Sequence, residues 1–86
     1  MGRFQESVGL FEKAIAIQAD SINYSNLGTS LFYLRQYQAA VSAFEKAVQA
    51  DSRSEVLMRN LADAYRWTGQ KPKAQETYFR AVALGD

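Results

Sequence analysis

The chain has 86 residues, of which 48% are hydrophobic and 22% charged, and its formal net charge is +1. These proportions are typical of one small globular domain, and one proline and five glycines are too few for collagen-like or disordered classes. Ten basic against nine acidic side chains leave no basic excess for phosphate, so we expect no nucleic-acid partner. The longest apolar runs, such as residues 31–34, are far shorter than the roughly 20 residues that span a bilayer, and no membrane partner is expected.

The residues that most enzymes use for catalysis are largely missing. The sequence contains no cysteine and no histidine, which removes disulfides, thiolate nucleophiles, the usual zinc sites and histidine acid–base chemistry. The glutamates are expected on separate solvated faces, and the glycines form no phosphate-binding loop. We therefore expect no enzyme activity and no cofactor. A cysteine-free chain also suits the cytosol, and we expect a cytoplasmic location.

Apolar residues recur at helical spacing along the whole chain, and short polar segments interrupt them. Leu, Ala, Glu, Gln, Lys and Arg dominate, and these residues favour helix. Ser52 and Glu55 are spaced like a capping box at the start of one helix, and Pro72 falls in the first turn of another. The pattern predicts an all-α fold of about five helices, over residues 3–18, 21–34, 37–50, 54–68 and 71–84.

An internal repeat is visible in two sets of landmarks. Phe11 and Phe44 are 33 residues apart, and Tyr78 follows Phe44 after 34. The triplet 26–28 (Asn-Leu-Gly) recurs at 60–62 as Asn-Leu-Ala, again after 34 residues. A period of this length is the signature of a stack of helical hairpins.

Small residues mark where the predicted helices should approach most closely. Gly28 and Ala62 occupy equivalent positions in their repeats. Ala40 and Ala47 are seven residues apart, as are Ala74 and Ala81, so each pair shares one helix face. A larger side chain at Ala40 or Ala47 is expected to overpack the hairpin.

The repeat resembles the tetratricopeptide repeat, in which an aromatic, Leu-Gly, Tyr, Ala, an aromatic and Ala follow one another and Pro ends the unit. Ser52 stands here where proline is usual. The resemblance implies a right-handed superhelical stack of antiparallel hairpins and a single domain over 1–86. Residues 1–19 are then the second helix of a partial repeat, and 21–51 and 54–86 are full repeats. The residues that carry the resemblance are Tyr24, Leu27, Gly28, Leu31, Ala40, Phe44 and Ala47, then Met58, Leu61, Ala62, Tyr65, Ala74, Tyr78 and Ala81.

The resemblance also implies a protein–protein interaction scaffold, whose first helices line a concave groove that binds a peptide or protein segment. Asparagines at 26 and 60 match positions that grip a peptide backbone in related arrays. The alternative is that each asparagine satisfies a nearby turn or helix end. The groove candidates are Asn26, Thr29, Tyr33, Arg59, Asn60, Asp63, Arg66 and Trp67.

Two further features of the groove have alternative interpretations. Arg59 and Arg66 suggest a carboxylate clamp like that of repeats holding chaperone tails, but Asp63 is spaced to pair with both. We therefore predict a self-neutralised triad. Trp67 lies next to the turn, which favours packing over Gly69 and the following helix; the alternative is an aromatic platform formed by Trp67 with Phe32 and Tyr33.

A different class of function is self-association, or a spacer role within a larger signalling protein. Stacked repeats bury their faces against neighbours, so terminal helices without a cap expose apolar surface. The candidates for exposure are Phe4, Val8, Phe11, Tyr78 and Val82. The remaining charges are interpreted as solvated, with Glu76 and Arg80 paired across one turn and the pairs Glu12–Lys13 and Glu45–Lys46 on the equivalent outer face.

Overall fold

The computed structural model describes residues 3–85, and regular structure in this range is entirely α-helical. The prediction of an all-α fold with five helices is confirmed over these residues, and each helix begins and ends within one residue of its predicted bounds. Residues 1, 2 and 86, at the ends of the predicted domain, lie outside the described range. The helices are α1 (Arg3–Ile17), α2 (Ser21–Tyr33), α3 (Tyr37–Ala50), α4 (Glu55–Trp67) and α5 (Lys71–Gly85).

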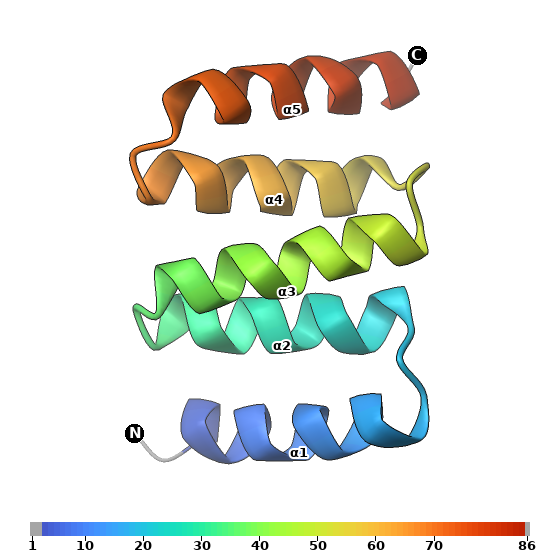
Figure 1. The fold of residues 1–86 in the computed structure, drawn as a ribbon, viewed down its shortest axis with the longest axis vertical. Helices are drawn as coiled ribbons and strands as arrows, with labels where there is room; N and C mark the ends of the chain where they lie inside the picture. The colour runs from blue at the N-terminus through green and yellow to red at the C-terminus, as the bar shows by residue number, and fades with distance from the viewer. Residues whose placement is uncertain (1–2, 86) are drawn as a thin grey trace.

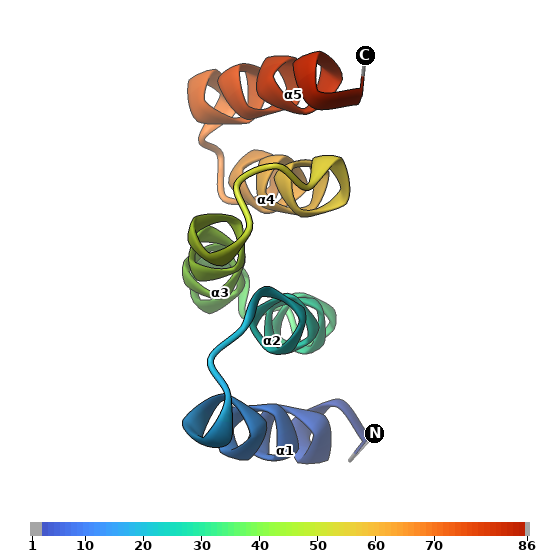
Figure 2. The same ribbon diagram turned by 90° about the vertical axis from the view of Figure 1, so that its right-hand side faces the viewer.

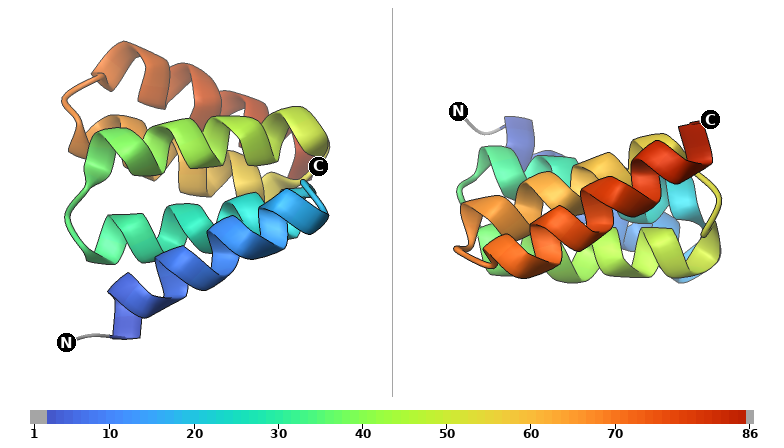
Figure 3. Two further views of the ribbon diagram at one scale, coloured as in Figure 1. Left: turned by 60° about the horizontal axis from the view of Figure 1, so that its bottom comes forward. Right: turned by 90° about the horizontal axis from the view of Figure 1, so that it is seen from above.

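The helices are stacked in the order of the sequence, and each runs antiparallel to the one before (Figure 1). The main helix–helix contacts join α1 to α2, α2 to α3, α3 to α4 and α4 to α5. Seen from the side, α2 and α4 lie in one layer and α3 lies in the other, whereas α5 runs obliquely across both (Figure 2). Views from below and above show that successive helices cross at modest angles (Figure 3). The core comes mainly from α3 and α4, with Leu31 of α2 and with Ala74 and Ala81 of α5.

The predicted close contacts between helices are present. Ala40 and Ala47 are fully buried in α3, and Ala74 and Ala81 are buried in α5. A Cβ atom on Gly28 would lie only 2.7–3.0 Å from three ring atoms of Phe44, so glycine is required for this approach of α2 to α3. Large side chains fill the remaining space, and the most buried of them is Met58 of α4 with 1% of its surface exposed.

The two hairpin turns use the same backbone conformation in both repeats. Arg35 ends the α2 segment with φ of 64°, and Gly69 has φ of 79° at the equivalent position after α4. The next N–H, of Gln36, donates to the Leu31 carbonyl at 2.9 Å, and that of Gln70 donates to the Tyr65 carbonyl at 2.8 Å. These are the bonds of a Schellman ending, in which a left-handed residue stops the helix and reverses the chain.

The predicted capping box at the start of α4 is wrong. Ser54, which has extended backbone angles, is the N-cap, and its hydroxyl oxygen accepts a hydrogen bond from the Leu57 N–H at 3.3 Å. Ser52 lies in the preceding turn. At the start of α2, the Asp20 carboxylate accepts from the Asn23 N–H at 2.8 Å in the same way. Both caps satisfy a donor that the first turn of a helix leaves free.

Within the described part of the chain, no helix has the length and apolar character needed to cross a lipid bilayer.

Candidate functional site

The layer formed by α2 and α4 carries two hollows, each lined by residues of both helices; we call this surface the α2–α4 face. The first, the Asp63 hollow, has a volume of about 180 Å³, and Phe44 of α3 contributes to its lining. The second, the Asn26 hollow, has a volume of about 200 Å³ and lies toward the beginnings of the two helices. The Asp63 hollow is lined by Thr29, Phe32, Tyr33, Phe44, Asn60 and Asp63. The Asn26 hollow is lined by Ser21, Ile22, Ser25, Asn26, Asp51, Ser54 and Leu57.

The two predicted asparagines lie in different hollows of this face. Asn60 is half-buried and Asn26 is exposed. Within residues 3–85, neither side-chain carboxamide makes a hydrogen bond. Thr29 differs, because its hydroxyl donates to the Ser25 carbonyl at 3.0 Å inside α2. The asparagine side chains therefore do not satisfy a turn or a helix end, and each keeps a free donor and a free acceptor.

The predicted triad of Arg59, Asp63 and Arg66 is wrong. Across residues 3–85, the single salt bridge joins Arg59 Nη2 to Glu55 Oε1 at 2.7 Å. A glutamate four residues before a basic residue is well placed for such a pair. Asp63 Oδ1 instead accepts a hydrogen bond from the Tyr78 hydroxyl, because α5 packs antiparallel on α4 and brings this ring beside it.

The electrostatic environment of Tyr78 reflects this contact. The hydrogen bond to Asp63, together with burial, raises the pKa of the Tyr78 hydroxyl above its ordinary value of 10.0. The Arg66 guanidinium beside the same hydroxyl acts in the opposite direction on that pKa. Tyr78 therefore stands between Asp63 and Arg66, where the sequence suggested a direct ion pair.

The aromatic platform, which was the alternative interpretation of Trp67, is present and larger than expected. Trp67, 61% exposed, contacts Phe32 edge to face with ring centres 6.0 Å apart. It also stacks on Tyr37 at 5.6 Å, so its ring neighbours belong to α2 and α3, in contrast to the predicted packing over Gly69. Tyr33 contacts Phe32 edge to face and stacks on Phe4 of α1 at 5.0 Å. We call these five rings the aromatic row: Phe4, Phe32, Tyr33, Tyr37 and Trp67.

Sequence reasoning missed Tyr37 as a member of the row. The signal was its position directly after the turn at 34–36, since an antiparallel hairpin brings the start of one helix beside the end of the other. The ends of α2 and α4 and the starts of α1 and α3 all lie at the left of Figure 1. Residues from four helices therefore meet at this end of the stack.

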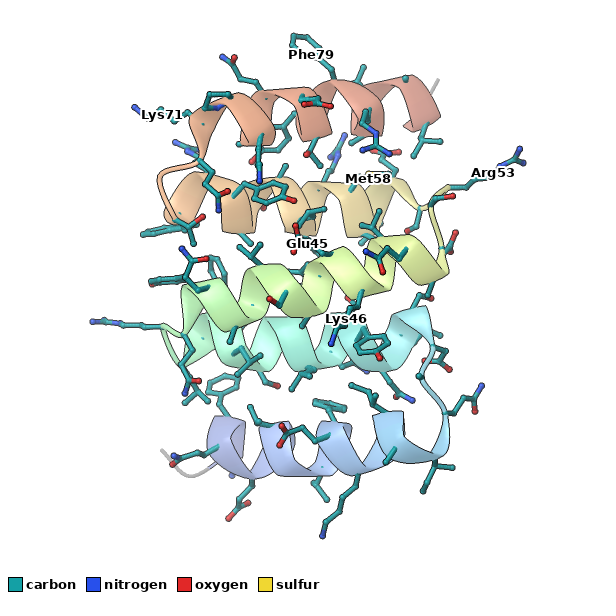
Figure 4. The ribbon with its side chains drawn as sticks, in the orientation of Figure 1. Glu45, Lys46, Arg53, Met58, Lys71 and Phe79 are labelled. Carbon is teal, nitrogen blue, oxygen red and sulfur yellow. The ribbon has the colours of Figure 1, made fainter. Side chains whose placement is uncertain are left out.

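Two charged residues of α3 make contacts with tyrosine side chains, although the sequence predicted that they are only solvated. Glu45 is half-buried and its Oε2 accepts a hydrogen bond from the Tyr65 hydroxyl at 2.6 Å. Burial, followed by this hydrogen bond, raises the pKa of Tyr65 to about 12. The Lys46 ammonium lies 5.8 Å from the centre of the Tyr24 ring (Figure 4). Among residues 3–85 no three acidic side chains converge in a way that could hold a metal ion.

The outer face of α5 is more exposed than predicted, and its central residue was missed. Phe79 is 75% exposed and points away from the stack (Figure 4), while Val82 is also exposed. Phe4 is 43% exposed, but Val8, Phe11 and Tyr78 are half-buried. The predicted pair of Glu76 and Arg80 is not formed in the part of the chain that is described. A shallow hollow on this face is lined by Pro72, Gln75, Glu76, Phe79, Arg80 and Ala83.

Comparison with known proteins agrees with this arrangement. Residues 31–85 match the family model described as tetratricopeptide repeat. The chain is also 41% identical over 63 residues to the small glutamine-rich tetratricopeptide repeat-containing protein 2 of Mycosarcoma maydis. That alignment covers 64% of this chain and 18% of the relative, so the chain spans less than a fifth of the length of the curated relative it matches.

Proposed function

Because the chain belongs to the tetratricopeptide repeat family, whose repeats generally mediate protein–protein interaction, we propose that it binds an extended segment of a partner protein along the α2–α4 face. Proteins of this family are typically scaffolds without catalytic activity. In this proposal residues 21–51 and 54–86 are full repeats, residues 1–19 are the second helix of a partial repeat, and the domain works in the cytoplasm.

The free carboxamides of Asn26 and Asn60 carry the proposal. They occupy equivalent positions of α2 and α4, and no hydrogen bond within residues 3–85 engages either of them. A carboxamide offers one acceptor and two N–H donors, so it can bond to both the N–H and the C=O of a peptide unit. Two of them on one face can hold a peptide backbone without selecting its side chains.

The aromatic row supports the same face as the interface. Tyr33 and Trp67 are 63% and 61% exposed, although both rings are already ordered by stacking. Aromatic side chains bury much area at low entropic cost and are enriched among residues that dominate binding energy. The row lies beside the Asp63 hollow, because Phe32 and Tyr33 belong to both.

A peptide array followed by fluorescence anisotropy tests the proposal. The array yields peptides that bind the wild-type chain, and these are titrated against Asn60→Ala, Asn26→Ala and Trp67→Ala. We expect each asparagine substitution to weaken binding at least about fivefold, since a net hydrogen bond contributes about 1 kcal/mol. Trp67→Ala should weaken it at least as much, because it removes aromatic contact area. Gln49→Ala removes an exposed carboxamide from α3 and serves as the matched control. Equal affinities for the three variants, the control and the wild type would contradict binding at this face.

Self-association through α5 is the second candidate, favoured by the exposure of Phe79. The residues that line the hollow on the outer face of α5 are spaced symmetrically about the middle of the helix. Two copies of this face can therefore pack antiparallel about a two-fold axis. This arrangement brings Glu76 of one copy near Arg80 of the other. Sedimentation equilibrium of the wild type and Phe79→Ser decides between the candidates: a monomer at tens of micromolar argues against self-association, and a dimer lost in the variant supports it.

A further inference from the structure

We infer that the Asp63 hollow binds an arginine side chain of the partner segment. The inference rests on the proposed function, because the arginine is supplied by the segment that lies along the α2–α4 face. It adds a chemical preference at one position to a surface that otherwise holds peptide backbone.

The charge of the hollow selects a cation. Of its six lining residues, Asp63 alone is charged. Arg59 and Arg66 are on the same helix but do not line the hollow. The Arg59 charge is paired with Glu55 at 2.7 Å, and the Arg66 guanidinium lies beside the Tyr78 hydroxyl. The Asp63 carboxylate would therefore repel an acidic side chain of the partner and attract a basic one.

Tyr78 holds the Asp63 carboxylate in place but occupies only part of its capacity to accept hydrogen bonds. The Tyr78 hydroxyl donates to Oδ1, and within residues 3–85 the Oδ2 atom has no hydrogen-bond partner. A carboxylate has about four acceptor sites, so most of its capacity remains for a ligand. Because Tyr78 fixes the orientation of the group, little side-chain freedom is lost when a guanidinium binds. The unpaired Asn60 carboxamide oxygen adds a neutral acceptor to the same hollow.

The walls and the size of the hollow favour arginine over lysine. Phe32 and Tyr33 supply aromatic rings, against which a planar guanidinium can stack while it bonds to a carboxylate in bidentate fashion. An ammonium group is strongly hydrated and makes neither contact as well. The volume of about 180 Å³ exceeds the roughly 150 Å³ of a cavity known to hold benzene, so a guanidinium fits.

Nuclear magnetic resonance titration tests the inference directly. The probes are capped heptapeptides of sequence Gly-Ser-Gly-Xaa-Gly-Ser-Gly, in which Xaa is arginine, lysine, glutamate or citrulline, the neutral isostere of arginine. We expect the arginine peptide to shift the amide signals of Thr29, Phe32, Asn60 and Asp63. Citrulline and glutamate peptides are expected to bind at least about tenfold more weakly, and lysine is expected to lie between. Equal affinity for arginine and citrulline would overturn the inference.

Matched charge variants of the protein complete the test. Asp63→Asn removes the charge but keeps an oxygen that accepts from Tyr78, so the fold is preserved; circular dichroism verifies this. It is expected to lower arginine-peptide affinity about tenfold, whereas Glu12→Gln, which removes one negative charge from the exposed surface of α1, should alter it less than about twofold. Equal losses in both variants would show that net charge, and not this hollow, governs binding.

The peptide array separates this inference from the proposed function. If array peptides bind in an Asn60-dependent way but show no preference for arginine, the inference is wrong and the proposed function stands. If the arginine peptide shifts the four amides while no array peptide binds along the face, the hollow is supported and the backbone-binding proposal is wrong.

Discussion

Gly28 and Gly9 are both inside helices, yet their surroundings are opposite. A Cβ on Gly28 would meet the buried Phe44 ring at 2.7–3.0 Å, whereas nothing lies within 4 Å of a Cβ on Gly9. Gly28→Ala should lower the free energy of unfolding by about 1–2 kcal/mol, because overpacking outweighs the gain in helix propensity. Gly9→Ala should raise it by about 0.5–1 kcal/mol.

Urea unfolding followed by circular dichroism measures both changes. The two variants add the same methyl group, so the difference between them isolates the contact with Phe44. A stabilised Gly28→Ala variant would contradict the close approach of α2 and α3.

The Tyr65 hydroxyl makes stability depend on pH in the alkaline range. Its pKa is raised from 10.0 to about 12, so the folded chain keeps the proton that the unfolded chain loses. The contribution of the Tyr65 hydroxyl to the free energy of unfolding is therefore complete below pH 10 and is lost as the pH rises to 12. Near neutral pH, Tyr65→Phe should cost about 1–2 kcal/mol, because the bond to Glu45 is charge-assisted but Glu45 is only half-buried.

Chemical denaturation over this pH range checks the prediction. The difference in free energy of unfolding between the wild type and Tyr65→Phe should become smaller from pH 10 to pH 12. Tyr33→Phe is the control, since its hydroxyl makes no hydrogen bond within residues 3–85 and its removal should change stability by less than about 0.5 kcal/mol. A gap that stays constant with pH would contradict the raised pKa.

At the scale of the helices, the two hairpin turns have the same backbone conformation but different residues at its central position. Both require a left-handed residue, which is glycine after α4 but arginine after α2. Arg35→Gly should raise the free energy of unfolding by about 0.5–1 kcal/mol, because it relieves the cost of positive φ. Gly69→Ala should lower it by a similar amount. Thermal unfolding of the two variants compares them, and a destabilised Arg35→Gly would mean that the arginine side chain itself stabilises the turn.

For the whole molecule, stability should vary along the stack. From Arg3 to Ile17, α1 has no buried residue and its main contacts are with α2, whereas α3 and α4 each bury six residues between two neighbours. We expect α1 amides to exchange with deuterium at least tenfold faster than those of α3 and α4, since local opening there exposes little apolar surface. Hydrogen exchange measured by mass spectrometry tests this. Uniform protection across the five helices would show a single cooperative unit.

The helices and their repeat could be predicted from the sequence because they depend on local information. Helical spacing, polar connectors and Pro72 set the helix bounds to within one residue. The period of 34 residues placed Gly28 and Ala62 at equivalent contacts, and both are buried. The groove candidates on α2 and α4 followed from the family resemblance together with helical spacing, and Asn60, Asp63, Thr29 and Tyr33 do line one hollow.

The side-chain partners were decided only by the tertiary structure. Tyr78 bonds to Asp63 across 15 positions of sequence, Tyr65 to Glu45 across 20, and Trp67 stacks on Tyr37 from a neighbouring helix. Each contact depends on how far one helix is rotated and shifted against the next. The packing of the core sets this rotation and shift, and the spacing of residues within one helix does not predict them. The sequence by itself thus determined the elements and their repeat, and the packing of the helices determined which of the polar and charged side chains pair with one another.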